Sequence, residues 1–233
     1  MIEIQTLATG SKGNCYYVTD GTTPILIECG ISFKQIQRKL NFSTTDIAAC
    51  LVTHEHKDHC GGLIGVLNAG IRCYMSPGTK EAIGMNHHRI KTVGNKKQFS
   101  IGTWTILPFD VQHDVSEPFG FLLVNKAGEK LLFATDTYYI KYRFQGITHL
   151  MVECNYCQSV LDANVETGRI HPSMKKRVMK SHFSLENVLE FLKANDLSKL
   201  QEIWLLHLSD SNSDEFLIRQ EVAKATGKLI HIP

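Results

Sequence analysis

The stretch LVTHEHKDHCGG, residues 51–62, places three histidines, one glutamate and one aspartate in six consecutive positions directly after a short apolar run. Where an extended backbone leaves a strand, side chains alternate, so His54 and His56 should point to the same side. Asp58 and His59 should follow one turn later, at the entry to the next helix. Imidazole and carboxylate groups suit zinc, manganese or iron, and no cysteine is interleaved as in a thiolate-rich structural zinc site. The segment therefore predicts two cation sites, one on the first two histidines and one on the aspartate and the third histidine.

Two ions need more ligands than this segment supplies, and three further candidates follow at the ends of apolar runs. They are His113 in FDVQHDV, Asp136 in LLFATDT and His207 in IWLLHLS. Asp136 could bridge both ions through its two oxygens, with one histidine completing each coordination sphere. The alternative for an isolated histidine at a strand end is a hydrogen-bonded core residue, which we favour for His149 and His231. The alternative for the first segment is a histidine-rich polar loop, but HxHxDH after a hydrophobic strand is specific ligand spacing.

Length and composition predict one domain spanning residues 1–233, because a hydrophobic content of 43% is enough to bury a full core. A formal net charge of +2 gives no global polyelectrolyte signal, so nucleic-acid binding would need a local patch. The N-terminal residues lack a secretory pattern, and no apolar stretch approaches a membrane span, so we expect a cytoplasmic protein with no membrane partner. The seven scattered cysteines suit reduced thiols, and the CxxC at 154–157 lacks a second pair.

Short strand-like runs alternate with helical patterns along the chain, which predicts an α/β layered architecture. Ser184 and Ser213 are the expected N-caps of two late helices, and Gly227 fits the position just past a helix end. We expect strands at 2–9, 15–19, 24–29, 48–53, 71–75, 104–109, 119–125, 130–136, 149–154 and 202–209, and helices at 32–40, 60–70, 77–84, 184–196 and 213–227.

The ordered pattern HxHxDH, His, Asp, His resembles that of the metallo-β-lactamase superfamily, over nearly the whole chain. The resemblance implies a four-layered αββα sandwich with a dinuclear site along the edge of its two sheets. It also implies two divalent metal ions, zinc or manganese, as cofactors. The ligands that match the superfamily pattern are His54, His56, Asp58, His59, His113, Asp136 and His207.

Three further motifs are similar to the YycJ/WalJ-type branch of that superfamily, itself similar to RNase Z and other nucleases. They are TLATGSKGNCYYV at 6–18, HDVSEPFGFLL at 113–123 and SHFSLENV at 181–188. Carried over by resemblance, Glu153 and His182 become candidates for supporting the site and transferring a proton. The chain departs from many members at Glu28, where they have aspartate, and this position is not one of the expected ligands.

A basic cluster and a glycine-rich loop also invite a functional interpretation. In HPSMKKRVMK, four cations fall within two turns of an expected helix just before His182, and they could hold a phosphodiester backbone. An ordinary solvated helix face is the alternative. In the loop TGSKGN, Ser11 and Asn14 could approach the metal centre, although loop architecture alone explains the glycines equally well. The four cations are Lys175, Lys176, Arg177 and Lys180.

Together these features predict a dinuclear metal-dependent phosphodiesterase or nuclease, with the resemblance favouring a DNA exonuclease over one acting on RNA. A metal-bridging hydroxide would attack phosphorus, Asp58 would bind one ion and orient that hydroxide, and His182, supported by Glu153, would protonate the leaving oxygen. One alternative is a hydrolase of a small ester, lactone or cyclic nucleotide. Another is a non-catalytic metal-dependent binding protein, which would not need so complete a ligand set. The sequence leaves the oligomeric state open.

Overall fold

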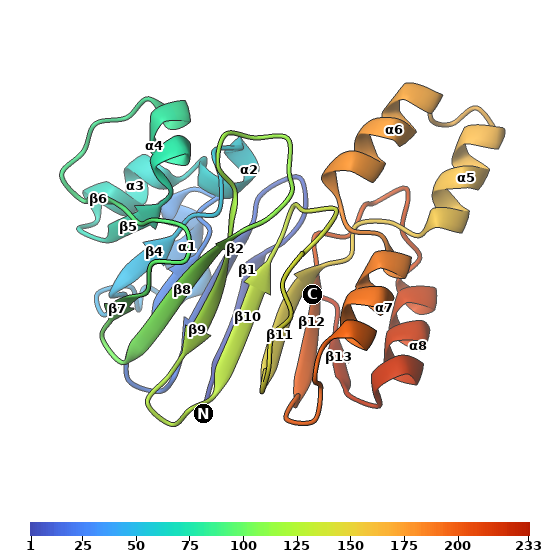
Figure 1. The fold of residues 1–233 in the computed structure, drawn as a ribbon. Helices are drawn as coiled ribbons and strands as arrows, with labels where there is room; N and C mark the ends of the chain where they lie inside the picture. The colour runs from blue at the N-terminus through green and yellow to red at the C-terminus, as the bar shows by residue number, and fades with distance from the viewer. The chain divides into compact units, whose positions relative to one another are not determined.

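The computed structural model describes all 233 residues, which fall into two compact units (Figure 1). The N-terminal unit comprises residues 1–110 and 115–129, and the C-terminal unit comprises residues 111–114 and 130–233. Each unit is described by itself below. That the whole chain forms one domain stays a prediction.

The N-terminal unit is built on a six-stranded sheet with the order β1-β2-β3-β4-β5-β6. The first three strands pair antiparallel, and β3 to β6 pair parallel. Strands β3 and β4 are buried along their whole length, as the continuous apolar runs of inner parallel strands predict. The bounds are β1 Glu3–Ala8, β2 Cys15–Thr19, β3 Ile25–Ile27, β4 Ala49–Leu51, β5 Arg72–Met75 and β6 Ile90–Thr92.

Four short helices and an antiparallel three-stranded ribbon complete the N-terminal unit. Helix α3 packs on α1 and on β5, and α4 packs on β6, so apolar side chains from helices and strands share one core. In the ribbon, β8 pairs with both β7 and β9. The bounds are α1 Phe33–Lys39, α2 Lys57–Cys60, α3 Leu63–Asn68, α4 Pro77–Ile83, β7 Phe99–Ile101, β8 Trp104–Asp110 and β9 Phe119–Val124.

The C-terminal unit contains four parallel strands in the order β10-β11-β12-β13 with helical connections. Helices α7 and α8 pack side by side, and α8 lies against β13, whereas α5 and α6 lie beyond the carboxyl ends of the strands (Figure 1). The bounds are β10 Lys130–Ala134, β11 His149–Glu153, α5 Gln158–Glu166, α6 Pro172–Ser181, α7 Leu185–Ala194, β12 Glu202–Leu206, α8 Glu215–Thr226 and β13 Leu229–His231.

Two of the three predicted helix ends are confirmed. The Ser184 hydroxyl accepts a hydrogen bond from the backbone of Asn187 at 3.1 Å, which caps α7, and Gly227 ends α8 with a φ of 64°. The prediction for Ser213 was wrong by one residue. Asp214 is the N-cap of α8, because the Ser213 hydroxyl donates instead to the Ser209 carbonyl at 2.7 Å.

All seven cysteines are free in the structure. None of the helices combines the length and the apolar character that crossing a membrane would require.

Candidate metal centre

The N-terminal unit holds four predicted donors on one segment, here called the contiguous set: His54, His56, Asp58 and His59. Strand β4 ends at Leu51, and the chain then extends to the N-cap of α2. His54 Nε2 lies 3.1 Å from His56 Nδ1. Two nitrogens that share a tetrahedral zinc ion at 2.0–2.1 Å are about 3.3 Å apart. The spacing of the first two histidines therefore fits one shared ion.

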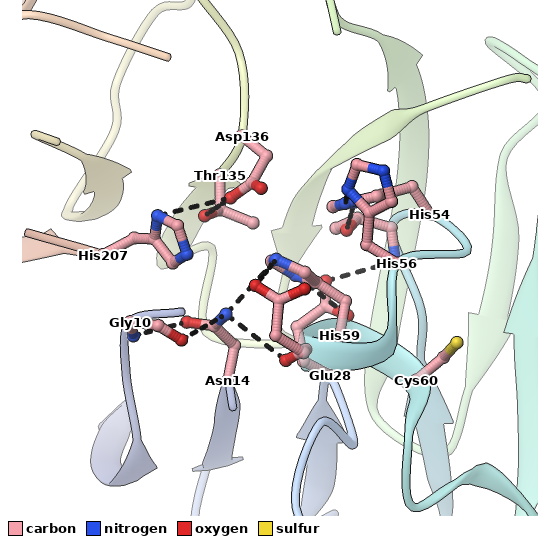
Figure 2. Close-up of polar contacts among 12 residues, drawn as sticks. Gly10, Asn14, Glu28, His54, His56, His59, Cys60, Thr135, Asp136 and His207 are labelled. Atoms are coloured by element: carbon pink, nitrogen blue, oxygen red, sulfur yellow. Dashed lines mark hydrogen bonds and ion pairs between the residues drawn. The ribbon is translucent and has the colours of Figure 1, made fainter. Parts of the chain in front are cut away.

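The second half of the contiguous set lies on α2, where the sequence predicted a helix entry. His59 is fully buried, and its Nε2 lies 3.3 Å from Asp58 Oδ2 and 3.2 Å from Asn14 Nδ2. The predicted approach of the TGSKGN loop to the candidate ligands is thus confirmed for Asn14 within this unit (Figure 2). An imidazole and a carboxylate oxygen at this spacing form the second potential ion position.

Glu28 is a site residue to which the sequence analysis gave no role. It follows β3 directly, is fully buried, and places Oε2 3.7 Å from His59 Nδ1 (Figure 2). Its Oε1 accepts a hydrogen bond from the Thr53 backbone at 3.2 Å. Burial raises the pKa of Glu28, and this effect outweighs the opposing interactions with His59 and Thr53. A carboxylate behind a ligating histidine fixes the ring orientation, and Glu28 lies where such a partner of His59 would be.

Backbone contacts lock the contiguous set to its neighbouring loops. The Asn14 amide donates to the Asp58 carbonyl at 2.6 Å, and the Gly30 amide donates to the Asn14 carbonyl at 2.8 Å. A Cβ at Gly30 would overlap the Asp58 carbonyl oxygen, and one at Gly62 would overlap the Ile31 carbonyl oxygen. Only glycine permits this close approach of three backbone segments.

The C-terminal unit assembles its donors from separate elements, and we call these residues the dispersed set: His113, Asp136, Glu153, His182 and His207. Asp136 follows β10, Glu153 ends β11 and His207 follows β12. Because these strands are parallel neighbours, their carboxyl ends meet at one edge of the sheet. All but His113 offer donor atoms that lie within 4.8 Å of one another.

Asp136 faces a different histidine with each oxygen. Its Oδ2 lies 3.8 Å from His113 Nε2, and its Oδ1 lies 3.7 Å from His207 Nδ1 (Figure 2 draws the second contact). Both Asp136 and His207 adopt the left-handed region, with φ of 47° and 53°, which is a strained conformation for these residues. The strained turns bring both side chains over the end of the sheet, in an arrangement that suits a bridging carboxylate.

The orientation of His113 is set by the backbone of α6. Its Nδ1 donates to the Ser181 carbonyl at 3.0 Å, which leaves Nε2 as the nitrogen directed at Asp136. The segment that carries His113 is held in turn by the Gln112 amide, which donates to Thr137 Oγ1 at 3.0 Å.

Glu153 contacts two histidines of the dispersed set. It is fully buried, and its Oε1 lies 2.5 Å from His182 Nδ1 and 3.2 Å from His207 Nδ1. Its Oε2 accepts hydrogen bonds from the backbone amides of Thr137 and Phe183. Burial alone would raise the pKa of Glu153, but the charge of His182 and the hydrogen bonds of Glu153 with His182 and His207 lower it. Burial alone would lower the pKa of His182, but the Glu153 carboxylate raises it, so His182 keeps its proton to higher pH than an ordinary histidine.

A pocket of about 780 Å³ opens beside the dispersed set. His113 lines it together with three cations of α6, namely Lys176, Arg177 and Lys180. Lys175 does not line this pocket, because its Nζ lies 2.5 Å from Asp162 Oδ1 on α5. The structure therefore brings three of the four predicted cations to a pocket with a candidate metal ligand.

Comparison with known proteins identifies the class. A family model described as the beta-lactamase superfamily domain matches residues 23–205, so the chain belongs to the beta-lactamase superfamily. It is 30% identical to the exodeoxyribonuclease YycJ of Bacillus anthracis, over 96% of this chain and 88% of that protein. It is 28% identical to the exodeoxyribonuclease WalJ of Streptococcus pneumoniae serotype 2, strain D39, over 89% of this chain and 81% of that protein.

A solved structure agrees with this family in its fold. The metallo-β-lactamase fold protein YhfI from Bacillus subtilis matches 100% of this chain and 95% of its own with a TM-score of 0.77 at 14% identity. The predicted fold class, the α/β metallo-β-lactamase fold, is thereby confirmed, as is the resemblance to the YycJ/WalJ-type branch. The chain is a metal-dependent hydrolase, and its imidazole and carboxylate donors are those that divalent metal ions use in such enzymes.

Proposed function

We propose that this chain is a dinuclear metal-dependent nuclease that degrades DNA from its ends. The observation that carries the proposal is the pocket beside the dispersed set, in which His113 and three cations of α6 line one cavity. A cavity with this charge suits the anionic backbone of a polynucleotide. The names of the two curated relatives, both exodeoxyribonucleases, support DNA as the substrate and attack from an end.

The two donor sets would together hold two divalent ions, zinc or manganese. Asp136 would bridge the ions, since its two oxygens face different histidines. When bound, such ions lower the pKa of water toward about 7 and neutralise charge on the phosphoryl oxygens. Asp58 would bind one ion and orient the attacking nucleophile. The residues that would hold the ions are His54, His56, Asp58, His59, His113, Asp136 and His207.

His182 would donate a proton to the leaving oxygen. Its Nδ1 is held by Glu153, so the opposite ring nitrogen, Nε2, is the atom that would deliver the proton. The raised pKa of His182 supports this role, because a general acid must hold its proton at the working pH. Glu153 keeps the imidazolium charged and oriented, while its other oxygen is fixed by two backbone amides.

Lys176, Arg177 and Lys180 would hold the phosphates that flank the scissile bond. All three line the pocket that also contains His113. Lys175 is left out of this set because of its ion pair with Asp162. The alternative of a small ester, lactone or cyclic nucleotide would not require so many cations in one cavity.

The deciding experiment incubates the purified protein with end-labelled single- and double-stranded DNA and RNA, each under zinc, manganese and magnesium. We expect stepwise shortening of DNA, abolished by a chelator and restored by one of the first two metals. Hydrolysis of a lactone or ester without any cleavage of nucleic acid would overturn the proposal.

A further inference from the structure

The connection between β10 and β11 carries an aromatic and basic surface that the metal ligands do not explain. Residues 135–148 contain no helix or strand. A connection of this length without secondary structure is uncommon in a compact unit unless it has a function. Its middle part, YYIKYR at 138–143, combines three tyrosines with two cations and no acidic residue. We call residues 138–143 the tyrosine segment.

The tyrosine segment is firmly anchored at both ends. Its first amide, on Tyr138, donates to the Gln112 carbonyl at 3.1 Å, next to His113. Just beyond its last residue, the Phe144 amide donates to Asn195 Oδ1 at 2.6 Å, and the Phe144 ring lies 6.5 Å from the ring of Phe191 on α7. The chain is therefore fixed on both sides of the segment by contacts that do not involve the side chains of Tyr138 and Tyr139.

Between these anchors, two of the three tyrosines and both cations are exposed, whereas Tyr142 is half-buried. Tyr138 and Tyr139 are 37% and 55% exposed, and Lys141 and Arg143 are also exposed. Ile140, in contrast, is buried and attaches the segment to the core. Tyrosine rings that were needed for packing would lie inside, as Ile140 does, so the outward rings are available to a ligand.

The tyrosine segment links two cavities of the C-terminal unit. Tyr138 lines the pocket that contains His113, and the next residue, Tyr139, lines a second pocket of about 260 Å³ against α7. Lys141 and Arg143 also line the second pocket. Its one acidic lining residue, Glu190, lies 3.0 Å from Lys193. Adjacent tyrosines thus line the two cavities, and each cavity has basic side chains in its lining.

We propose that the tyrosine segment is a platform for a single strand of nucleic acid, which it leads toward the pocket beside His113. The inference rests on the proposed nuclease function and names the form of substrate that would enter the site. Tyr138 and Tyr139 would stack on successive bases, because every base presents a π-face to an aromatic ring. Lys141 and Arg143 would pair with the phosphates. Bases in a duplex are stacked on one another, so the enzyme should prefer unpaired or frayed ends.

The test measures binding of a fluorescent oligothymidylate whose phosphorothioate linkages resist cleavage. Loss of one stacking ring should raise the Kd of Tyr139→Ala about fivefold or more. Tyr139→Phe keeps the ring and should stay within about twofold of the native protein. The matched control is Phe216→Ala, which removes an exposed aromatic side chain from α8, outside both cavities. Fluorescence anisotropy gives each Kd, and circular dichroism checks folding.

The outcomes separate this inference from the proposed function. If the native protein shortens oligonucleotides but Tyr139→Ala binds them as tightly as Phe216→Ala does, the platform is wrong and the nuclease stands. If Tyr139→Phe weakens binding as much as Tyr139→Ala, stacking is not the cause and the platform is again wrong. Equal affinity for blunt duplex and single strand would also overturn it. If the native protein neither binds nor cleaves any polynucleotide, the proposed function itself fails.

Discussion

The two donor sets differ in how the chain builds them. The contiguous set lies within six positions after one strand, whereas the dispersed set is gathered from residues 113 to 207 by three parallel strands and two loops. A fully buried glutamate nevertheless faces a histidine of each set: Glu28 lies behind the contiguous set, and Glu153 belongs to the dispersed set. Glu28 lies 3.7 Å from His59, while Glu153 lies 2.5 Å from His182.

This difference in distance has a chemical consequence. Burial raises the pKa of Glu28, because the opposing interactions with His59 and Thr53 compensate only in part for the loss of water. For Glu153, the effect of burial is overcome by the charge of His182, so its pKa is lowered and that of His182 is raised. We infer that Glu28 serves only to position a histidine of the contiguous set, whereas Glu153 of the dispersed set also takes part in proton transfer.

The largest expected effect comes from Asp136→Ala. Because each Asp136 oxygen faces a different histidine, its loss should release most of both ions and reduce hydrolysis to background. His56→Ala, in the contiguous set, should release only one of them. Elemental analysis of each gently purified variant measures how many ions it retains. The control is Asp196→Ala, which changes an exposed residue. A native protein that holds one ion, with Asp136→Ala unchanged, would refute the bridging role.

His182→Ala should separate proton transfer from metal binding. Cleavage of nucleic acid should fall by about 10² to 10⁴, because a sugar alkoxide leaves poorly without a proton. Hydrolysis of bis-p-nitrophenyl phosphate should fall far less, since nitrophenolate leaves readily. Metal content should not change, and His88→Ala, an exposed histidine, is the control. Equal losses on both substrates, or loss of metal, would make His182 a structural residue or an additional ligand.

The two glutamates should give different phenotypes when each is changed to glutamine. Glu28→Gln should weaken metal affinity by about 10- to 100-fold through a less well oriented His59. Glu153→Gln should instead lower the rate on nucleic acid more than the rate on the nitrophenyl ester, because His182 loses its anionic partner. Chelator competition measures the affinities, and saturating metal gives the rates. If the two variants show the same metal affinities and the same rates, the two glutamates do not have different roles.

The smallest effect is expected at the cations of α6. For Lys176→Ala combined with Arg177→Ala, each lost phosphate contact should reduce the slope of log KM against log salt by about 0.7 to 0.9. Lys175→Ala is the matched control, since this lysine pairs with Asp162. Steady-state kinetics on a polynucleotide over a range of salt concentrations measures the slopes. If Lys175→Ala changes the slope as much as the double variant does, lining the pocket does not decide which cations of α6 contact phosphates.

Long apolar runs made most of the fold predictable, and short or weakly patterned elements escaped. Strands β6, β7 and β13 have three residues each, too few to show a period of two. Helix α2, with only four residues, was expected only as the entry to one helix at 60–70, and α5 has a sequence, QSVLDANVE, with no clear apolar face. Neighbouring strands and helices, rather than local sequence, stabilise these elements.

The candidate site was predictable to the extent that its residues form recognisable patterns. The contiguous motif identified four donors, and each donor of the dispersed set that ends an apolar run could be found in the same way. Glu28 also follows an apolar run, PILIEC, and this was its available signal. The contact of Glu28 with His59 arises from the pairing of β3 with β4, which a linear sequence does not display. The tyrosine segment escaped because exposure, not composition, distinguishes it from core tyrosines.

The close backbone approach at Gly30 and Gly62 makes tolerance to mutation depend on more than the ligands. In a saturation-mutagenesis map, both positions should be as intolerant as the histidines, although neither contributes a side chain. A new side chain at residue 30 would push on the carbonyl of Asp58 and thereby displace the neighbouring His59. We therefore expect the space beside the donors to restrict substitution as strictly as the donors themselves do.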